Sequence, residues 1–339
     1  MAKAVLFKSI ERFDSFRKKL ESYGIDFDVV DFEDPNWIEY DFLKADFAIF
    51  YPSFNFSSNH PLALWKVYDH MDFLAETYPH LALFPDPKIV KYYNDKYRQY
   101  LFLRKHRYPV PETIPLYTKD CIPYAEKKLG YPMVLKNRHG AGGGAVFMAH
   151  NRAQVKKYFR LTQLDILKGS SLLHFIELYS KRVSLYWLIK RGQSPYPFFS
   201  PPLLAQKFVT IDRDLKTVVG GYEVVEAHWR LQADEAMWKM NIDGGGIGVW
   251  GFVPQEAIDL SNRLAKQLNA SWLNIDLISS NGQFMITEFS PVWHHYAYRE
   301  KPSFVYNNDY NIDVPLEVSL DLEKIIIDSL LADVEKKKS

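Results

Sequence analysis

Two carboxylates lie on either side of a short turn late in the chain, in a pattern that could hold a metal ion. Asp276 stands in the apolar run 272–278, Glu288 stands in the run 284–289, and Asn281-Gly282 lies between the runs. In an antiparallel hairpin with this turn, opposite residues have numbers that add to 563 or 564, so Asp276 and Glu288 face each other. Facing carboxylates repel unless they are protonated or bind a cation, and Mg²⁺ commonly takes such ligands. We favour a metal site over an accidental pair or a pair bonded to Arg or Lys.

A lysine followed by a glycine-rich loop is the second pattern that could do chemistry. The predicted strand 129–136 ends at Lys136, and Gly140-Ala141-Gly142-Gly143-Gly144 follows. Backbone N–H groups in such a loop can approach an anion closely. The order differs from the P-loop, in which the lysine comes after the glycines, and from the dinucleotide-binding fingerprint. On spacing alone, a phosphate-binding loop and a flexible hairpin turn are equally good interpretations.

The composition narrows the class of protein. The chain has 339 residues, and its formal net charge of +1 predicts no general attraction to nucleic acid or to an anionic membrane. The single cysteine, Cys121, excludes an internal disulfide and a cysteine metal site. No apolar run at the N-terminus is long enough for a signal peptide or a membrane span, so we expect a cytoplasmic protein.

The first part of the chain alternates strand and helix signals. We expect strands over 4–7, 27–30 and 45–51 and a helix over 14–23, which is typical of a small open α/β domain with a parallel sheet. A helix over 97–105 follows, and two prolines then enforce an extended connector at 109–113.

The rest of the chain favours hairpins and helices. We expect a helix over 153–161, an amphipathic segment over 172–191, a strand over 203–209, and a hairpin over 215–228 that turns at Gly220-Gly221. A helix over 254–269, the hairpin of Asp276 and Glu288, and a helix over 320–334 complete the chain. The fold class is therefore α/β, with α+β character in the later parts.

Several motifs in order resemble those of one enzyme family. They are Asn94-Asp95-Lys96, 109–113, 130–136 with its glycine loop, 205–209, Asp214-Leu215-Lys216 with Gly220-Gly221 and Arg230, Asn241 with its glycines, and Asp276 with Glu288-Phe289-Ser290. Together they resemble the ATP-grasp ligases, especially the glutathione synthetase-like and ribosomal-protein-modifying carboxylate–amine ligases. The resemblance covers about residues 91–295 and implies an ATP-grasp fold behind an N-terminal open parallel α/β domain.

The resemblance implies a set of ATP-binding residues. Lys96 and Lys136 would contact the phosphates, and the loop with Gly142, Gly143 and Gly144 would close over them. The backbone of Gln206, Lys207, Phe208 and Val209 would bond the adenine edge. Asp212 would bind the ribose hydroxyls, with Asp214 as the alternative, and Lys216 would face phosphate or substrate.

The resemblance also implies the catalytic and metal-binding residues. Arg230, with Lys136 and with Asn241 nearby, would stabilise the transferring phosphoryl group. Asp276 and Glu288 would carry Mg²⁺, or Mn²⁺ in its place. Ser290 would be a further ligand at a position where the family usually has asparagine. A hydroxyl is a weaker ligand, so the number of metal ions stays open.

The resemblance divides the chain into an N-terminal domain at 1–90, a lid subdomain at 91–208, and a C-terminal subdomain at 209–339 that carries the metal hairpin. The interval between Lys136 and Gln206 is longer than is usual for this lid. It indicates an insertion at 172–199, whose role the sequence does not reveal.

The implied activity is that of an ATP-dependent ligase. It would activate a carboxylate as an acyl-phosphate, couple it to an amine or similar nucleophile, and release ADP and phosphate. A kinase or phosphotransferase and a non-catalytic ATP-binding regulator stay open as alternatives. We expect small-molecule carboxylate and amine substrates, no nucleic acid and no membrane as partners, and an assembly that could be a homodimer.

Overall fold

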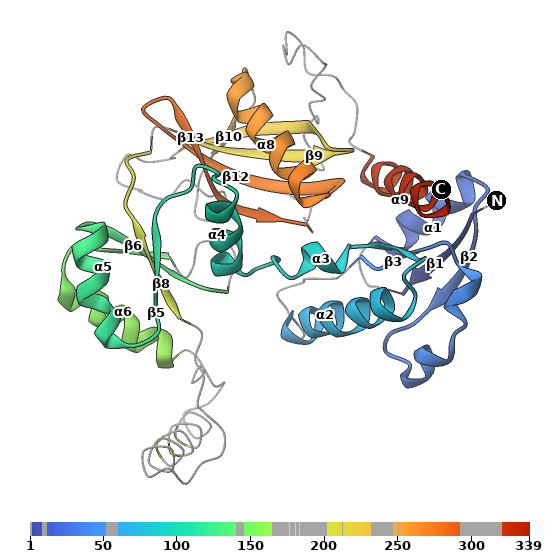
Figure 1. Ribbon diagram of the computed structural model, residues 1–339, viewed down its shortest axis with the longest axis horizontal. Helices are drawn as coiled ribbons and strands as arrows, with labels where there is room; N and C mark the ends of the chain where they lie inside the picture. The colour runs from blue at the N-terminus through green and yellow to red at the C-terminus, as the bar shows by residue number, and fades with distance from the viewer. Residues whose placement is uncertain are drawn as a thin grey trace. The chain divides into compact units, whose positions relative to one another are not determined.

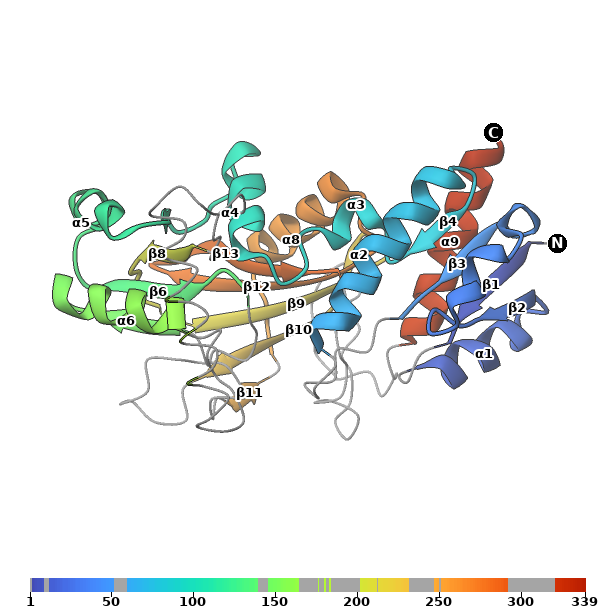
Figure 2. The ribbon, with the colours of Figure 1, turned by 90° about the horizontal axis from the view of Figure 1, so that it is seen from below.

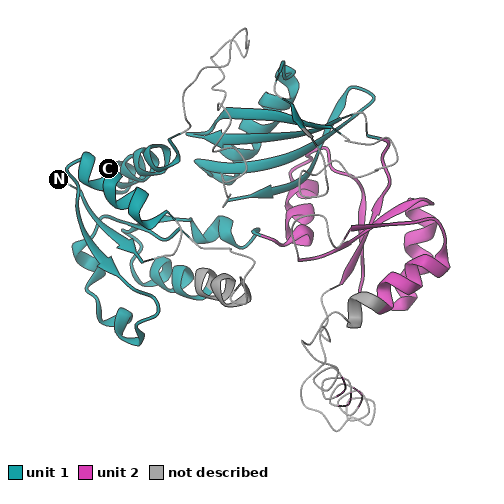
Figure 3. Ribbon diagram, turned by 180° about the vertical axis from the view of Figure 1, so that it is seen from behind, with its two compact units in different colours: residues 1–93, 211–339 teal, residues 94–210 magenta. Residues whose placement is uncertain are grey.

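The computed structural model describes residues 2–8, 12–51, 60–139, 146–164, 202–211, 213–231, 247–249, 251–291 and 321–339, and the single residues 176, 180 and 183. The chain forms two compact units, residues 1–93 with 211–339 and residues 94–210, coloured teal and magenta in Figure 3. The boundaries of the units lie close to the predicted domain limits at 90 and 208. The division into three domains itself stays a prediction.

The first unit begins with the parallel sheet that the sequence predicts. The strand order is β2-β1-β3-β4, and all neighbouring pairs are parallel. The strands are β1 (Lys3–Phe7), β2 (Asp26–Val30), β3 (Phe47–Ile49) and β4 (Ala82–Phe84), and the helices of this region are α1 (Phe13–Ser22), η1 (Pro35–Glu39), η2 (Phe42–Lys44), α2 (His60–Thr77) and α3 (Pro87–Val90). The buried strands β1 and β3 and the helix α1 supply much of its core, including Phe7, Phe16 and Ile49.

The C-terminal helix α9 (Leu322–Lys338) belongs to the same core. Its residues Leu322, Ile326 and Ile327 are buried with those of the parallel sheet. Arg12 and Glu323 form an ion pair of 2.8 Å whose side chains are almost covered. Helix α9 therefore ties the end of the chain to its N-terminal domain.

A second, antiparallel sheet in the first unit has the order β11-β10-β9-β12-β13. Its strands are β9 (Arg213–Gly220), β10 (Glu223–Leu231), β11 (Ile247–Val249), β12 (Trp272–Ser280) and β13 (Gln283–Ser290). Two tight turns connect β9 to β10 and β12 to β13, and the central residues of both have positive φ, 63° and 71° at Gly221-Tyr222 and 51° and 74° at Asn281-Gly282. Both predicted hairpins are therefore present. The first turn lies at Gly221-Tyr222, one residue later than the predicted Gly220-Gly221, because Gly220 still belongs to β9 and pairs with Glu223.

Helix α8 (Gln255–Leu268) lies across one face of this sheet (Figures 1 and 2). It buries Ala257, Ile258, Leu264 and Ala265, and it contacts β9, β10 and β12. The apolar spacing of residues 254–269 follows the helical period because one side of α8 rests on the sheet.

The second unit contains another antiparallel sheet, with the order β5-β8-β6-β7. Its elements are α4 (Lys96–Lys105), β5 (Thr113–Leu116), η3 (Lys119–Cys121), α5 (Ile122–Leu129), β6 (Met133–Asn137), β7 (Val146–Ala149), α6 (Arg152–Leu164) and β8 (Leu203–Lys207). The core between this sheet and the helices α5 and α6 contains Leu129, Met133, Leu135, Val155 and Ala205.

Two predicted strands of this unit are shorter than expected. The strand expected from Leu129 begins at Met133, because Leu129 ends α5 and Gly130, at φ 70°, terminates the helix. The strand expected over 203–209 ends at Lys207. The predicted insertion at 172–199 lies outside the described residues, apart from three single positions.

The structure combines a parallel sheet, two antiparallel sheets and covering helices, so the predicted mixed α/β class is confirmed. Among the described residues, none of the helices has the length and apolar character needed to cross a membrane.

Candidate active site on the antiparallel sheet of the first unit

Residues from neighbouring strands of the antiparallel sheet form a charged row. Glu288 pairs with Asp276, Asp276 with Lys216, and Lys216 with His228, across β13, β12, β9 and β10. Side chains of directly opposite residues project from the same face of a sheet. The sequence prediction that Asp276 faces Glu288 is therefore confirmed, and the structure adds Lys216 and His228 to the same row.

The rows on either side carry more polar residues on this face, because every second residue of a strand points the same way. One row contains Arg230, Asp214 and Ile278. The other row contains Glu226, Val218, Asn274 and Ser290. We call the side that displays these three rows the polar face.

The alternate residues of the same strands form an apolar face. It carries Leu215, Ala227, Trp229, Ile275 and Leu277, all of which are buried. Helix α8 covers this side, and the hydroxyl groups of Thr217 and Ser261 meet there at 2.9 Å. The apolar face is thus part of the core, and the polar face holds the ionisable groups.

A β-bulge in β13 puts Glu288 on the polar face. The register shifts between Asp276 and Leu277, because Leu277 pairs with Ile286 and Thr287 is the extra residue. In an unbroken ladder, Thr287 would oppose Asp276 and Glu288 would turn to the apolar face. The Thr287 hydroxyl donates to the backbone oxygen of Asp276 at 3.1 Å, which fixes the bulge to the neighbouring strand. Bulges commonly redirect a side chain next to a functional site.

Arg230 connects two carboxylates on the polar face. Its Nε and Nη2 donate to Asp214 Oδ1 at 3.2 and 2.5 Å, and its Nη2 lies 3.2 Å from Asp276 Oδ1. Lys216 Nζ lies 3.6 Å from the same Asp276 oxygen. The predicted catalytic Arg230 and the predicted phosphate-facing Lys216 therefore converge on the predicted metal ligand Asp276. Asp214, considered in the sequence as a ribose ligand, instead pairs with Arg230.

The charges of this cluster set the pKa values of its carboxyl groups. Burial opposes ionisation of Asp276, but the positive charges of Arg230 and Lys216 outweigh it and hold the pKa below its ordinary value. Burial raises the pKa of Asp214, and the nearby negative charge of Asp276 adds to the effect. The cluster therefore favours the ionised form of Asp276 and opposes that of Asp214.

The chemistry of Asp276 and Glu288 fits a hard divalent cation. Asp276 Oδ1 is buried and accepts no hydrogen bond within the described part of the chain, although two cationic groups lie within 3.6 Å. A search of the described residues finds no group of three or more His, Cys, Asp or Glu side chains placed to hold a metal. Mg²⁺ needs no such group, because one or two carboxylates with waters and substrate phosphates are its usual ligands. These two residues could hold Mg²⁺, and Ser290 lies in the next row.

Glu226 and His228 are polar residues of this face that the sequence reasoning missed. Both side chains are almost fully buried, and His228 Nδ1 lies 3.5 Å from Glu226 Oε1. The sequence does contain a pattern that indicates them. Glu226, His228 and Arg230 are spaced two residues apart in a predicted strand, which puts all three on one face.

The motif Asn94-Asp95-Lys96 is organised by a buried ion pair in the second unit. Asp95 caps α4 by accepting from Arg98 N at 3.0 Å, and it accepts two bonds from Arg138 at 2.9 and 2.6 Å. Lys96 N donates to Arg138 O at 3.0 Å. Burial opposes ionisation of Asp95, but Arg138 holds its pKa below the ordinary value. Lys96, in the first turn of α4, is thereby fixed beside the residues that precede the glycine loop.

The other predicted ATP-binding residues of the second unit lie on or next to its sheet. Lys136 is on β6, opposite Val146 and Leu204. Gln206 is buried on β8, and its Nε2 donates to Thr113 Oγ1 at 2.9 Å. Lys207 N donates to Glu112 O at 2.8 Å, and Phe208 and Val209 follow the strand.

The remaining predicted site residues are outside the described part of the chain. They are Gly142, Gly143, Gly144, Asp212 and Asn241.

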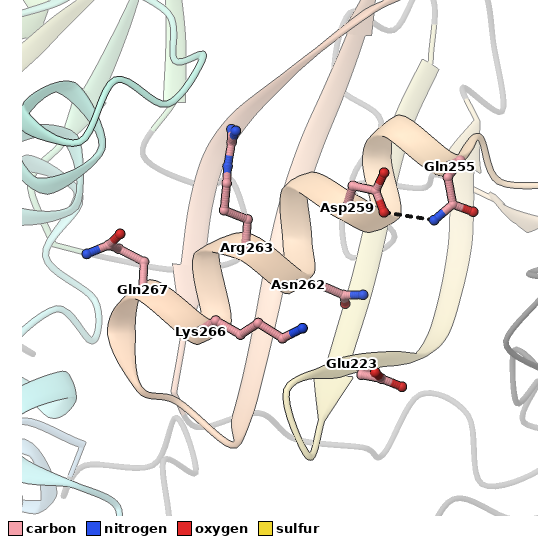
Figure 4. Close-up of a pocket in the computed structure, with 7 residues that line it drawn as sticks. All are labelled: Glu223, Gln255, Asp259, Asn262, Arg263, Lys266 and Gln267. Atoms are coloured by element: carbon pink, nitrogen blue, oxygen red, sulfur yellow. Dashed lines mark hydrogen bonds between the residues drawn. The ribbon is translucent and has the colours of Figure 1, made fainter.

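A groove of about 710 Å³ lies on the outer side of α8 (Figure 4). Its lining is polar and comes from α8 and from Glu223 at the start of β10. Asp259 accepts a bond from Gln255 at 2.8 Å there, and Asn262 accepts from Val224 N at 2.8 Å. The groove contains none of the residues of the polar face, so we do not assign the predicted chemistry to it.

The known proteins that are similar in sequence include synthases and ligases. No protein-family model matches the chain. Over 201 residues the chain is 27% identical to beta-citrylglutamate synthase B of Danio rerio, covering 57% of this chain and 40% of the relative. It is 25% identical over 201 residues to coenzyme gamma-F420-2:alpha-L-glutamate ligase of Methanocaldococcus jannaschii, covering 58% of this chain and 57% of the relative. The matched region thus spans about half the length of these relatives.

Solved structures of ATP-grasp enzymes share the fold over most of the chain. The ATP-grasp ligase PsnB, complexed with a minimal precursor, has a TM-score of 0.56 at 12% identity and covers 98% of this chain and 99% of its own. N5-carboxyaminoimidazole ribonucleotide synthetase from Thermotoga maritima has a TM-score of 0.55 at 14% identity and covers 87% and 70%. The chain therefore shares the fold of the ATP-grasp ligase PsnB.

Proposed function

We propose that the protein is an ATP-dependent ligase that activates a carboxylate as an acyl-phosphate and couples it to an amine, releasing ADP and phosphate. The observation that carries this proposal is the row Lys216, Asp276 and Glu288 beside Arg230 and Asp214 on the polar face. This group of residues places positive side chains next to carboxylates that could bind Mg²⁺. A reaction between two anionic reactants requires such positive charge to offset their repulsion. The fold and the ligases among the relatives support the same activity.

The residues of the polar face would act mainly through charge and position. A carboxylate that attacks the γ-phosphate of ATP brings two anions together, and Arg230 would offset their repulsion and the charge that develops during transfer. Asp214 holds Arg230 through Nε and Nη2, so the guanidinium would be oriented before substrate arrives. Asp276 and Glu288 would hold Mg²⁺, which when bound would neutralise phosphate charge.

Residues of the second unit would bind the nucleotide. We assign Lys96 and Lys136, with Gly142, Gly143 and Gly144, to the phosphates, and the backbone of Gln206, Lys207, Phe208 and Val209 to the adenine. From residues 211–339 of the first unit, Asp212 would bind the ribose and Asn241 would assist Arg230. The support is the motif order, together with the Asp95–Arg138 pair that fixes Lys96.

The relatives suggest which substrates to try first. Two of their names contain glutamate as the component that is joined, in beta-citrylglutamate and in the glutamate ligase of coenzyme F420-2. We propose small carboxylates such as citrate as donors and L-glutamate as the first acceptor. A cytoplasmic location, a homodimer, independence from nucleic acid and membranes, and Mn²⁺ as a substitute metal stay predictions.

A phosphate-release screen tests the proposal. Purified protein with ATP and Mg²⁺ is offered pooled carboxylates with L-glutamate and other amines, and hydroxylamine is added in parallel to trap acyl-phosphate as a hydroxamate. A ligase releases phosphate only with a carboxylate and forms the hydroxamate. A kinase gives a stable phosphorylated product without an acceptor, and a regulator binds ATP without consuming it.

Variants connect the activity to the assigned residues. We expect Lys136→Ala and Glu288→Ala to lose ATP turnover and to keep the circular dichroism spectrum of the wild type. Glu256→Ala, an exposed carboxylate in the first turn of α8, is the matched control and should keep full turnover. Undiminished turnover in both site variants contradicts the proposal.

A further inference from the structure

Glu226 is a buried carboxylate on β10, in the row next to that of Asp276 and Glu288. Its side chain is 1% exposed, and within the described residues neither Oε1 nor Oε2 accepts a hydrogen bond. Among the described residues, His228 Nδ1 is a basic group close to it, at 3.5 Å from Oε1. A buried acceptor that lacks a donor costs free energy, so such a group in a native protein calls for an explanation.

His228 does not supply the missing positive charge. Its side chain is fully buried, and burial lowers its pKa below the ordinary value for histidine. Near neutral pH the imidazole is therefore uncharged, so His228 is not a cationic partner for the Glu226 carboxyl group.

A second acceptor without a donor lies in the same row of the polar face. Asn274 is 6% exposed, and within the part of the chain that the structure describes its Oδ1 accepts no hydrogen bond. Glu226 and Asn274 both pair with Val218 in the ladders of β9, so they stand on either side of it on one face. Among the described residues, this row therefore holds two buried side chains whose acceptor oxygens have no donor, next to the row of Asp276 and Glu288.

The charge of Glu226 indicates which reactant it serves. ATP and the carboxylate substrate are both anions, and a buried carboxylate beside them would repel them. An amine is the one reactant of the proposed ligase that carries positive charge in water, and its ammonium group brings N–H donors. Alcohols and thiols bring neither a charge nor more than one donor.

We propose that Glu226, assisted by Asn274, binds the ammonium group of the acceptor and so selects amines over alcohols and thiols. The inference rests on the proposed ligase function and names the side chains that would recognise its amine. A charge-assisted hydrogen bond to a buried carboxylate is among the stronger polar contacts in proteins.

The first test is independent of activity. Because Glu226 is uncompensated without ligand, Glu226→Gln should raise the midpoint of thermal unfolding of the ligand-free protein. Glu223→Gln is the matched control, since Glu223 lies at the exposed start of the same strand, and it should leave the midpoint unchanged. A lower midpoint for Glu226→Gln shows that the carboxylate is needed by the fold and overturns the proposal.

The second test compares charged and uncharged acceptors. The panel pairs L-glutamate and other amino acids with their 2-hydroxy acids, and hydroxylamine, which is uncharged near neutral pH, serves as a common reference nucleophile. We expect the wild type to use amines in preference to hydroxy acids. In Glu226→Gln the KM for the amine should rise about tenfold or more relative to the KM for hydroxylamine. Asn274→Ala should give a smaller rise in the same ratio.

The outcomes separate the two proposals. A wild type that forms no hydroxamate with any carboxylate refutes the ligase function itself. A wild type that forms hydroxamate but takes hydroxy acids, or none of the amines, overturns the role of Glu226. An unchanged KM ratio in Glu226→Gln also overturns the role of Glu226. A rise in the KM for Mg²⁺, without a rise in the KM for the amine, overturns it as well, because it would indicate that Glu226 is a metal ligand.

Discussion

The polar and apolar faces of the antiparallel sheet are built from the same strands and differ in where they carry ionisable side chains. On β12, Ile275 and Leu277 are fully buried toward α8, whereas Asp276 between them meets Arg230 and Lys216. On β10, Ala227 and Trp229 alternate with Glu226, His228 and Arg230. One backbone thus carries a core on one side and an ionic cluster on the other.

The buried apolar side chains explain how this sheet holds charged groups at fixed positions. The apolar side chains anchor the backbone through burial, which is the largest favourable contribution to folding. The polar side chains then need little free energy of their own to be positioned. We therefore expect substitutions on the apolar face to change mainly stability, and substitutions of Arg230, Asp276 and Glu288 on the polar face to change mainly chemistry.

The largest effects should come from paired variants on the two faces. Glu288→Gln removes a proposed metal ligand and should reduce ATP turnover to background with an unfolding midpoint near that of the wild type. Leu277→Ala leaves a cavity in the core and should lower the free energy of unfolding by about 2–5 kcal/mol. The catalytic constants of the folded Leu277→Ala protein should stay close to the wild type. Urea titration and phosphate release measure both, and equal effects on stability would break the distinction between the faces.

Arg230→Lys should give the next largest loss. Lysine keeps the positive charge but cannot reach Asp214 and the reacting phosphate with a fixed fork of donors, so kcat should fall by about 10²–10³-fold. The KM for ATP should change less, because the contribution of Arg230 is expected mainly in the transition state. Steady-state phosphate release gives both constants. A lysine variant with wild-type kcat would show that charge alone suffices.

The Asp95–Arg138 pair lies in the second unit and is not part of the polar face. It tests whether a charged pair outside that face contributes to stability and not to chemistry. Asp95→Asn leaves Arg138 without its charged partner, although asparagine can still cap α4, and we expect a loss of about 2 kcal/mol in the free energy of unfolding at neutral pH. Because the pKa of Asp95 in the folded protein lies below the ordinary 3.8, its contribution is complete above that value and is lost as pH falls through the folded pKa. The variant and the wild type should therefore converge in strong acid. Urea titrations at neutral and acidic pH measure the difference, and a constant gap would contradict this assignment.

Thr287→Ala should give the smallest effect. It removes one partly buried hydrogen bond to Asp276 O and should cost about 1 kcal/mol of stability. Because this bond holds the bulge that turns Glu288 to the polar face, the KM for Mg²⁺ should rise several-fold. Thr287→Ser keeps the hydroxyl and serves as the control. Unchanged metal dependence in Thr287→Ala would mean that the bulge is fixed by the backbone alone.

Much of this sheet could be predicted because it depends on local sequence. The turns at Gly221-Tyr222 and Asn281-Gly282 set the registers of both hairpins, and the alternation of apolar and polar residues sets their faces. The turn at Asn281-Gly282 places Asp276 opposite Thr287 or Glu288, and the bulge, which shifts the pairing by one residue, selects Glu288. The same alternation would have identified Glu226 and His228, had it been applied to β10.

The contacts that could not be predicted join residues far apart in sequence. Asp95 and Arg138 are 43 residues apart, and Arg230 and Asp214 are 16 apart on neighbouring strands. The position of the bulge at Thr287 depends on a bond to β12, which only the folded sheet provides. Asp214 was therefore considered as a ribose ligand, and its pairing with Arg230 was not foreseen.

The central claim is that a carboxylate of the substrate attacks ATP and is then released from phosphate by an amine. The most direct measurement uses a carboxylate that is active in the screen, labelled with ¹⁸O in its carboxyl group, with ATP, Mg²⁺ and L-glutamate or another active amine. Mass spectrometry then follows the label. We predict that one ¹⁸O atom passes from the carboxylate to inorganic phosphate for each amide formed. Amide formation with unlabelled phosphate, or ATP hydrolysis with all of the label kept by the carboxylate, would contradict the account.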